Sequence, residues 1–142
     1  MKKLLSVLLV SLLLIGCSED RVLLDELTNK GSEKSELMYY ESGLFNGIGY
    51  DVYSNGKLKS EVNYKDGKRD GLCKGWYVND QLSNEMNFNN GTIDGLYREW
   101  YENGQLKFYG QYKDGEEDGI WKYYDKNGKL DERNYKDGEE IK

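Results

Sequence analysis

The sequence contains no histidine, no proline and no alanine. Without histidine, the commonest general base and metal ligand of enzymes is missing. Alanine is the residue that favours helices most, whereas the thirteen tyrosines and seventeen glycines suit pleated strands and tight turns. Acidic residues outnumber basic ones, with a net charge of −6, so there is no basic stripe to replace the counterions of nucleic-acid phosphates. These absences disfavour a helical protein, a histidine-based enzyme and a nucleic-acid-binding protein.

The first sixteen residues have the composition of a secretory signal peptide. Lys2 and Lys3 provide a positive start, and the apolar run that follows ends at Gly16. This run is too short to cross a bilayer comfortably, which takes about twenty residues, but it matches the apolar region of a signal peptide. An uncleaved N-terminal anchor helix is the alternative interpretation.

The segment Leu14-Ile15-Gly16-Cys17 resembles the lipobox of bacterial lipoproteins. The resemblance implies that the Cys17 thiol receives a diacylglyceryl group, that the bond before Cys17 is cut, and that acyl chains such as palmitate anchor the mature protein in a membrane. Ser18 slightly favours the outer membrane, because aspartate after the cysteine is the better-known retention signal of the inner membrane. We therefore expect a lipid-anchored protein of the cell membrane or outer membrane, facing the periplasm or the exterior.

Cysteine is scarce, because Cys17 and Cys73 are the only two in the chain. If lipid occupies Cys17, Cys73 has no intramolecular partner and the protein has no disulfide framework. We expect Cys73 to be a small buried or half-buried residue, and a reactive thiol is the other interpretation.

The rest of the chain repeats with a period of 24 residues. A glycine recurs four times at this spacing, and a leucine follows each of these glycines by eleven residues. Between them lies an Asn-Gly pair, or Asn79-Asp80 in the second unit, and an aromatic residue later precedes another glycine by three. The four period-24 glycines are Gly47, Gly71, Gly95 and Gly119. Repeats of this length are typical of an array in which each unit packs on its neighbours.

Each unit has the pattern of a β-hairpin. In the third unit, apolar and polar residues alternate over 95–101, Asn103-Gly104 supplies two residues suited to the positive φ of a tight turn, and 105–112 returns as a second strand. Period-two spacing predicts one apolar face per unit. In the three units in turn, its predicted members are Ile48, Val52, Leu58, Val62 and Tyr64; Leu72, Trp76, Leu82, Met86 and Phe88; and Leu96, Trp100, Leu106, Phe108 and Tyr112.

Residues 94–106 and 118–130 resemble the bacterial variant of the MORN repeat, and the resemblance covers about residues 39–142. It implies an all-β fold of tandem antiparallel hairpins in one elongated, curved sheet. The predicted divisions are a signal peptide at 1–16, a lipidated tether with a degenerate cap at 17–38, and a MORN-variant repeat domain at 39–142 with units at about 47–70, 71–94, 95–118 and 119–142. A tether without a cap is the alternative for 17–38. Asp80 departs from the pattern, but aspartate tolerates the left-handed region better than most residues.

Bacterial proteins of this repeat type are often classed with the antitoxins of YwqK-type toxin–antitoxin modules. The resemblance therefore implies a non-catalytic protein-interaction module, antitoxin- or immunity-like, whose partner would be a toxin. No catalytic residues, metal ligands or cofactor motif emerge from the sequence. The acidic groups at 116–118 and 139–140 fall in predicted turns, and Asp125-Lys126-Asn127-Gly128 lacks the further ligands of a calcium loop.

Four tyrosines are the candidate binding surface: Tyr77, Tyr97, Tyr101 and Tyr109. We expect them on the face opposite Trp76 and Trp100, where a row of tyrosines can stack on sugar rings or anchor a protein partner. Simple filling of cross-strand pairs in a thin sheet is the other explanation. Because the segment around Trp76 superficially resembles choline- or glucan-binding repeats, a cell-envelope carbohydrate-binding module is the alternative function.

Overall fold

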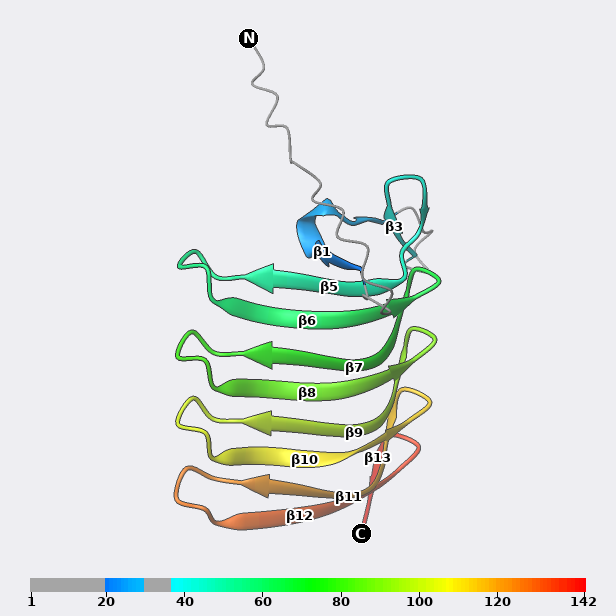
Figure 1. Ribbon diagram of the computed structural model, residues 1–142. Coiled ribbons are helices and arrows are strands. Elements are labelled where there is room, and N and C mark those ends of the chain that lie inside the picture. The colour runs from blue at the N-terminus through cyan, green and yellow to red at the C-terminus, as the bar shows by residue number, and fades with distance from the viewer. Residues whose placement is uncertain (1–19, 30–36) are drawn as a thin grey trace, which may run out of the picture.

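The computed structural model describes residues 20–29 and 37–142 (Figure 1). The predicted signal peptide and the predicted lipidation site Cys17 lie outside the described residues. Apart from one 3₁₀ turn, η1 (Leu24–Glu26), the regular structure in these ranges consists of strands. None of the described residues belongs to a helix long and apolar enough to span a membrane.

Ten strands form one open sheet, in which neighbours follow one another in chain order. Their order is β1 (Arg21–Leu23), β5 (Gly47–Val52), β6 (Leu58–Lys65), β7 (Lys68–Trp76), β8 (Leu82–Asn89), β9 (Thr92–Trp100), β10 (Leu106–Lys113), β11 (Glu116–Tyr124), β12 (Leu130–Lys136) and β13 (Glu139–Ile141). Strand β1 pairs with β5 in parallel, and every later pair is antiparallel. The predicted all-β array of tandem hairpins in a single elongated sheet is confirmed.

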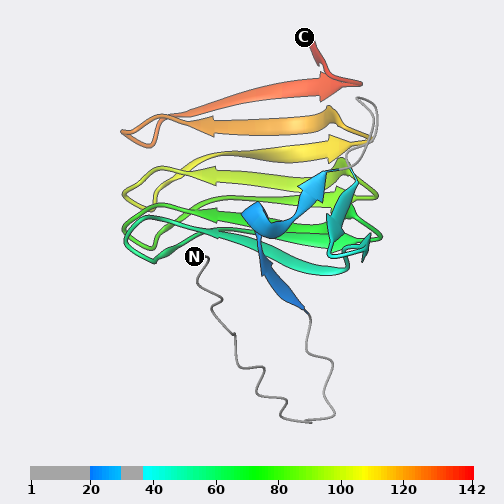
Figure 2. The ribbon, with the colours of Figure 1, turned by 90° about the horizontal axis from the view of Figure 1, so that it is seen from above.

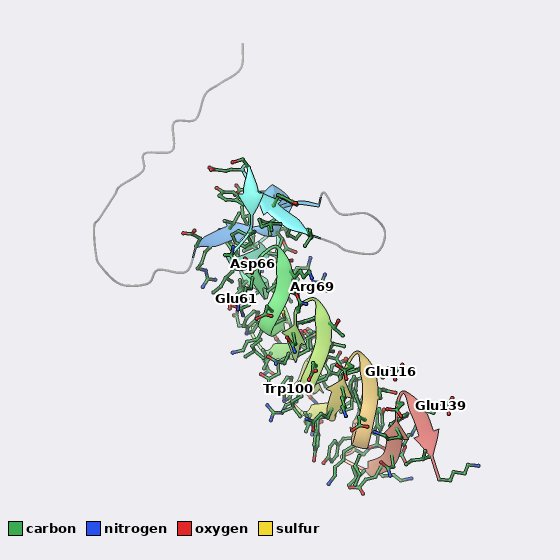
Figure 3. All side chains as sticks on the ribbon, turned by 90° about the vertical axis from the view of Figure 1, so that its right-hand side faces the viewer. Glu61, Asp66, Arg69, Trp100, Glu116 and Glu139 are labelled. Atoms are coloured by element: carbon green, nitrogen blue, oxygen red, sulfur yellow. The ribbon has the colours of Figure 1, made fainter. Side chains whose placement is uncertain are left out.

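A small second sheet lies beside the first unit. It contains β2 (Thr28–Asn29), β3 (Met38–Tyr40) and β4 (Gly43–Leu44). Together with β1 and η1 it forms the part of the protein that we call the cap, residues 21–45 as far as they are described. Figure 2 shows the cap on one side of the long sheet, and Figure 3 shows the hairpins following one another away from it.

The tight two-residue turns of the long sheet lie at three Asp-Gly pairs and at Asn90-Gly91, and we call this side of the sheet the Asp-Gly end. Asp114 and Gly115 both have positive φ, 53° and 91°, as a type I′ turn requires. At Asn103-Gly104 only the glycine has positive φ, and the Asn103 side chain accepts a hydrogen bond from the Gln105 N–H at 3.0 Å. A turn lies where it was predicted, closed by a hydrogen bond from the Gly104 N–H to the Tyr101 carbonyl at 2.8 Å, but its type differs from the prediction because Asn103 does not have positive φ. Asp80 does adopt the left-handed conformation expected of it, with φ of 67°.

The period-24 glycines lie directly opposite the recurring aromatic residues, of which the last, Tyr135, is displaced by one residue from the 24-residue spacing. The four cross-strand pairs are Gly47–Tyr64, Gly71–Phe88, Gly95–Tyr112 and Gly119–Tyr135. Each of these glycines has positive φ, a backbone conformation that residues with side chains disfavour. The two strongest signals in the sequence are thus one contact, repeated in every unit.

Because directly paired residues lie on the same face of a sheet, the pairing sorts the side chains into two faces. On the cap face, Val22, Leu27 and Phe45 of the cap pack on Tyr64 of β6. The opposite face, which we call the open face, has no described strand packed over it (Figure 2). The main cluster of buried residues therefore lies between the cap and the first unit.

The apolar face predicted for each unit is divided between these two faces. In the second unit Met86 lies on the cap face, whereas Leu82 lies on the open face. A β-bulge is the reason: Gly75 pairs with Asn84, but the next residue, Trp76, pairs with Leu82. One residue of β8 is thus skipped, and the alternation of side chains slips by one position. The first and third units have equivalent shifts, so the prediction of a single apolar face was wrong in the same way in all three.

A continuous apolar seam nevertheless runs along the open face, beside the Asn-Gly loops. Its cross-strand pairs, one from each unit, are Val52–Leu58, Trp76–Leu82, Trp100–Leu106 and Tyr124–Leu130. Both tryptophans and the leucines paired with them are half-buried. The sequence therefore predicted the seam correctly, although it occupies one margin of the sheet.

Tyrosine hydroxyl groups connect successive units at the Asn-Gly end. Tyr53, Tyr77 and Tyr101 donate hydrogen bonds to the carbonyl oxygens of Trp76, Trp100 and Tyr124, at 2.7, 2.7 and 2.9 Å. In each case the acceptor lies 23 residues further along the chain, in the next unit. We call these three bonds the tyrosine ladder. Asp125 occupies the fourth position and instead accepts hydrogen bonds from the N–H groups of Asn127 and Lys129 in its own loop.

At the opposite end of the strands lie the Asp-Gly turns and the turn at Asn90-Gly91. The glycine of each of these turns donates its N–H to a carbonyl oxygen of the preceding unit or of the cap. These bonds are Gly67 to Phe45, Gly91 to Arg69, Gly115 to Ile93 and Gly138 to Glu117, at 2.8–3.1 Å. Each unit is therefore bonded to its neighbour at both ends of its strands.

Candidate functional site

Side chains along the middle of the cap face increase in size from the first unit to the fourth. The equivalent positions are Gly49, Cys73, Tyr97 and Trp121. Leu24 and Leu27 of the cap lie directly over Gly49 and leave no room for a side chain there. No part of the cap reaches the fourth unit, and there Trp121 fills the equivalent space itself and is only 1% exposed. The cap face is thus covered at one end by the cap and at the other by its own side chains.

Six aromatic rings cover the C-terminal half of the cap face: Tyr97, Phe108, Tyr112, Trp121, Tyr123 and Tyr135. Trp121 is central, and the rings of Tyr112 and Tyr135 stand edge-on to it at centroid distances of 5.1 and 6.2 Å. Gly110 provides the space under the indole, because a Cβ there would lie 2.1 Å from Cδ2 of Trp121. This aromatic cluster is a small core, since its rings pack on one another.

The four tyrosines predicted to share one face lie in three different places. Tyr97 belongs to the aromatic cluster, and Tyr109 lies on the open face between Arg98 and Lys122. Tyr77 and Tyr101 lie at the Asn-Gly loops with their hydroxyl groups engaged in the tyrosine ladder. The prediction of a single row was therefore wrong, because the bulges and loops interrupt the alternation on which it depended. The 24-residue spacing of Tyr53, Tyr77 and Tyr101 was the signal that sets the ladder apart.

Burial raises the pKa of Tyr97 to about 12. The nearby Glu99 carboxylate, which accepts a hydrogen bond from the Tyr97 hydroxyl at 3.2 Å, adds to the shift. An unfolded tyrosine titrates near pH 10. The folded protein therefore holds this proton more tightly, so the stabilisation is complete below about pH 10 and is lost as the pH rises towards 12. In Tyr97→Phe, the fall in urea midpoint between about pH 8 and pH 11 should be smaller than in the wild type. Tyr40→Phe, at an exposed position, is the control, and an unchanged fall in Tyr97→Phe would contradict the prediction.

Cys73 lies in a hollow of about 180 Å³ in the middle of the cap face. The hollow is lined by apolar side chains that include Val62, Met86 and Phe88, with Ser60 and Asn84 among the polar ones. Cys73 is 6% exposed, and burial raises the pKa of its thiol. These properties match the sequence-based interpretation of a small buried residue.

We expect the Cys73 thiol to be unreactive in the folded protein. In Cys17→Ser, where Cys73 is the only thiol, alkylation by iodoacetamide should be more than about tenfold slower than in urea, because the reaction requires local opening. A cysteine introduced by Val78→Cys in a Cys73→Val background is the matched control, because Val78 is 47% exposed. Equal alkylation rates for the two thiols would show that Cys73 is accessible.

The open face presents the same types of residue in the same columns in successive units. One apolar column is the seam, and a second runs near the Asp-Gly turns: Ile48, Leu72, Leu96 and Ile120. Between them lies a column of mostly charged residues, in which Arg98 pairs with Glu85 and Lys122 pairs with Glu132. Leu72, Leu96 and Ile120 are 40, 38 and 58% exposed. The open face is therefore a regular apolar surface whose charges are largely neutralised within the face.

The described part of the chain holds no group of three or more cysteine, aspartate or glutamate side chains placed to bind a metal ion. The acidic residues at 116–118 and 139–140 lie in β11 and β13, so the prediction that they fall in turns was wrong. Figure 3 shows Glu116 and Glu139 near the C-terminal end of the array. A hydrogen bond from Lys136 at 2.9 Å holds the pKa of Asp118 below its usual value.

Three segments, residues 45–66, 93–114 and 117–137, match the MORN repeat variant. Comparison with curated proteins found no match. Each matching segment contains two strands and the Asn-Gly loop that joins them: β5–β6, β9–β10 and β11–β12. The hairpin β7–β8 lies outside the matches but has the same pairing and the same ladder bonds, with Asp80 in place of the loop glycine.

Proposed function

We propose that this chain, which carries MORN-variant repeats, is a non-catalytic protein-interaction module held on a membrane by lipid on Cys17. The open face supports the first part of this proposal. It carries two apolar columns across four units, and no described strand covers it. Exposed apolar surface arranged in this way is typical of a binding surface for another protein.

The composition of the open face also favours a protein partner. Trp76, Trp100 and Tyr124 are half-buried along the seam, and aromatic residues of this kind supply most of the binding energy in protein interfaces. Between the two apolar columns, Arg98 is paired with Glu85 and Lys122 with Glu132, so a partner would not have to desolvate these four charges unpaired.

A sugar-binding site would require aromatic rings that are free to stack on a sugar. On the cap face the rings pack on one another, and the central ring, Trp121, is almost fully buried. The tyrosines of the predicted row are dispersed over three places. The cap face therefore lacks the free stacking surface that a carbohydrate needs, and we propose a protein partner on the open face.

The proposal includes an antitoxin- or immunity-like role, in which the partner is a toxin. This role is supported by the classification of bacterial proteins with this repeat type among the antitoxins of YwqK-type modules. The anchoring part of the proposal is supported by the resemblance of Leu14-Ile15-Gly16-Cys17 to a lipobox.

Site-specific photo-crosslinking in the living cell tests the proposal. The full-length protein would carry benzoylphenylalanine at Leu96 or Ile120 on the open face, or at Val78 in an exposed loop as the control. We expect the same crosslinked protein from both open-face positions and none from Val78. Leu96→Asp combined with Ile120→Asp should lower co-purification of that protein more than about tenfold, as for loss of central interface residues. Crosslinks that are absent from the open face, or equally strong at Val78, would overturn the proposal.

A further inference from the structure

We infer that the N-terminal edge of the long sheet lies at the surface of a phospholipid bilayer and that the four units project from it in chain order. This inference rests on the proposed lipidation of Cys17 and adds the orientation of the array. It also defines which part of the open face a partner meets at a given distance from the membrane.

The first step is the length of chain between the lipid and the sheet. Ser18 and Glu19 are the only residues between Cys17 and Asp20. Three residues of extended chain span at most about 11 Å. The carbonyl oxygen of Asp20 accepts a hydrogen bond from the N–H of Ile48 at 2.8 Å, which places Asp20 beside β5. A lipid on Cys17 would therefore keep this corner of the sheet within about 11 Å of the lipid headgroups.

The second step is the position of that corner in the sheet. Strand β1, which begins directly after Asp20, is the first strand of the ten. Each further strand lies about 4.8 Å from the one before it. Strands β7, β9 and β11 are the third, fifth and seventh strands after β1, at about 14, 24 and 34 Å from it along the sheet. The short tether therefore brings the first unit close to the bilayer and leaves the fourth unit far from it.

The third step distinguishes this upright orientation from an array that lies flat. A flat orientation requires attraction between one face and the bilayer, either from basic clusters that bind headgroups or from apolar side chains that enter the interface. The open face carries exposed apolar columns, but in the proposal above a protein partner covers them, so that charge is what remains to draw a face to the lipid. Residues 20–29, at the anchored corner, include the acidic residues Asp25 and Glu26. The one basic residue in this range, Arg21, is paired with Glu61. The whole chain has a net charge of −6, so anionic lipids repel it. Nothing in this charge distribution draws either face down onto the membrane.

The three tryptophans can report distances from the bilayer, because Trp76, Trp100 and Trp121 lie on β7, β9 and β11. Three variants of the full-length acylated protein would each keep one tryptophan and carry phenylalanine at the other two. In liposomes with dansyl-labelled headgroups, energy transfer should fall in the order Trp76, Trp100, Trp121, with at least about a twofold difference between the first and the last for a separation of about 20 Å. Equal transfer from all three tryptophans, or the reverse order, would overturn the orientation.

A second measurement leaves the tryptophans in place. A fluorophore attached through cysteine at Leu72, Leu96 or Ile120, which are exposed positions on the same three strands, should report the same order of distances. Mass spectrometry of the mature N-terminus separates the two hypotheses. Absence of acyl groups on Cys17 would contradict the proposed anchoring and the orientation with it, whereas an acylated Cys17 with equal transfer efficiencies would contradict the orientation alone. Cys17→Ser should not float with the liposomes.

Discussion

Gly110→Val is expected to lower the free energy of unfolding by about 3 kcal/mol, at the upper end of the usual cost of overpacking. The hydrogen atom of Gly110 faces the flat side of Trp121, and even a Cβ would lie 2.1–2.5 Å from three atoms of the indole. The ring cannot move away easily, because Tyr112, Tyr123 and Tyr135 pack around it. Close-packed interiors transmit such a displacement to their neighbours. Urea denaturation followed by tryptophan fluorescence measures the loss.

Gly43→Ala is the matched control. No heavy atom lies within 4 Å of the position that a Cβ would take at Gly43, and Gly43 does not have positive φ. Its stability should change by less than about 0.5 kcal/mol, as for other surface substitutions. If Gly110→Val proved as stable as Gly43→Ala, Trp121 would not lie flat over Gly110, and the self-covered aromatic cluster would be incorrect.

Removal of all three hydroxyl groups of the tyrosine ladder should lower the free energy of unfolding by about 3 kcal/mol, since a hydrogen bond typically contributes about 1 kcal/mol. The triple variant is Tyr53→Phe, Tyr77→Phe and Tyr101→Phe. Each substitution removes a bond between one unit and the next while the ring remains in place. In a linear array, the contacts between neighbouring units make folding cooperative. We therefore also expect a broader urea transition.

The control for the ladder is Tyr40→Phe, which removes a hydroxyl group from an exposed side chain of the cap. It should leave the urea midpoint unchanged. The three single variants should each cost about a third of the triple variant, because their hydroxyl groups lie in different units and act independently. A triple variant as stable as Tyr40→Phe would show that the hydroxyl groups do not connect the units.

The two surfaces of the sheet have different roles in this interpretation. The cap and the aromatic cluster complete the cap face, so that face supplies stability. The open face presents Leu96, Ile120 and the seam without a covering strand, so it is the surface available to a partner. An array that projects from the membrane would present this surface along its whole length.

Much of the architecture was predictable because it depends on local chemistry that recurs every 24 residues. The period-24 glycines opposite aromatic residues, the Asp-Gly turns and the apolar seam all follow from residue types at regular spacing. The loop at Asn103-Gly104 was predicted as a turn of the wrong type, because its conformation depends on a side-chain bond from Asn103 to the backbone. The resemblance of residues 94–106 and 118–130 to the MORN repeat agrees with the three segments that match the MORN repeat variant.

The sequence by itself thus determined the unit, the number of hairpins and their order in one sheet, because turns, strands and pairing between chain neighbours are local. Only the tertiary structure decided which face each side chain occupies. A bulge of one residue reverses the alternation from that point on, and no residue type in the sequence marks Ser83 or Lys107 as the site of one. The bulge at Lys107 also separated Tyr109 from Tyr97. A different irregularity, between β10 and β11, lies at Gly110. Trp121 packs on Gly110 there, in a part of the sheet that the cap does not cover.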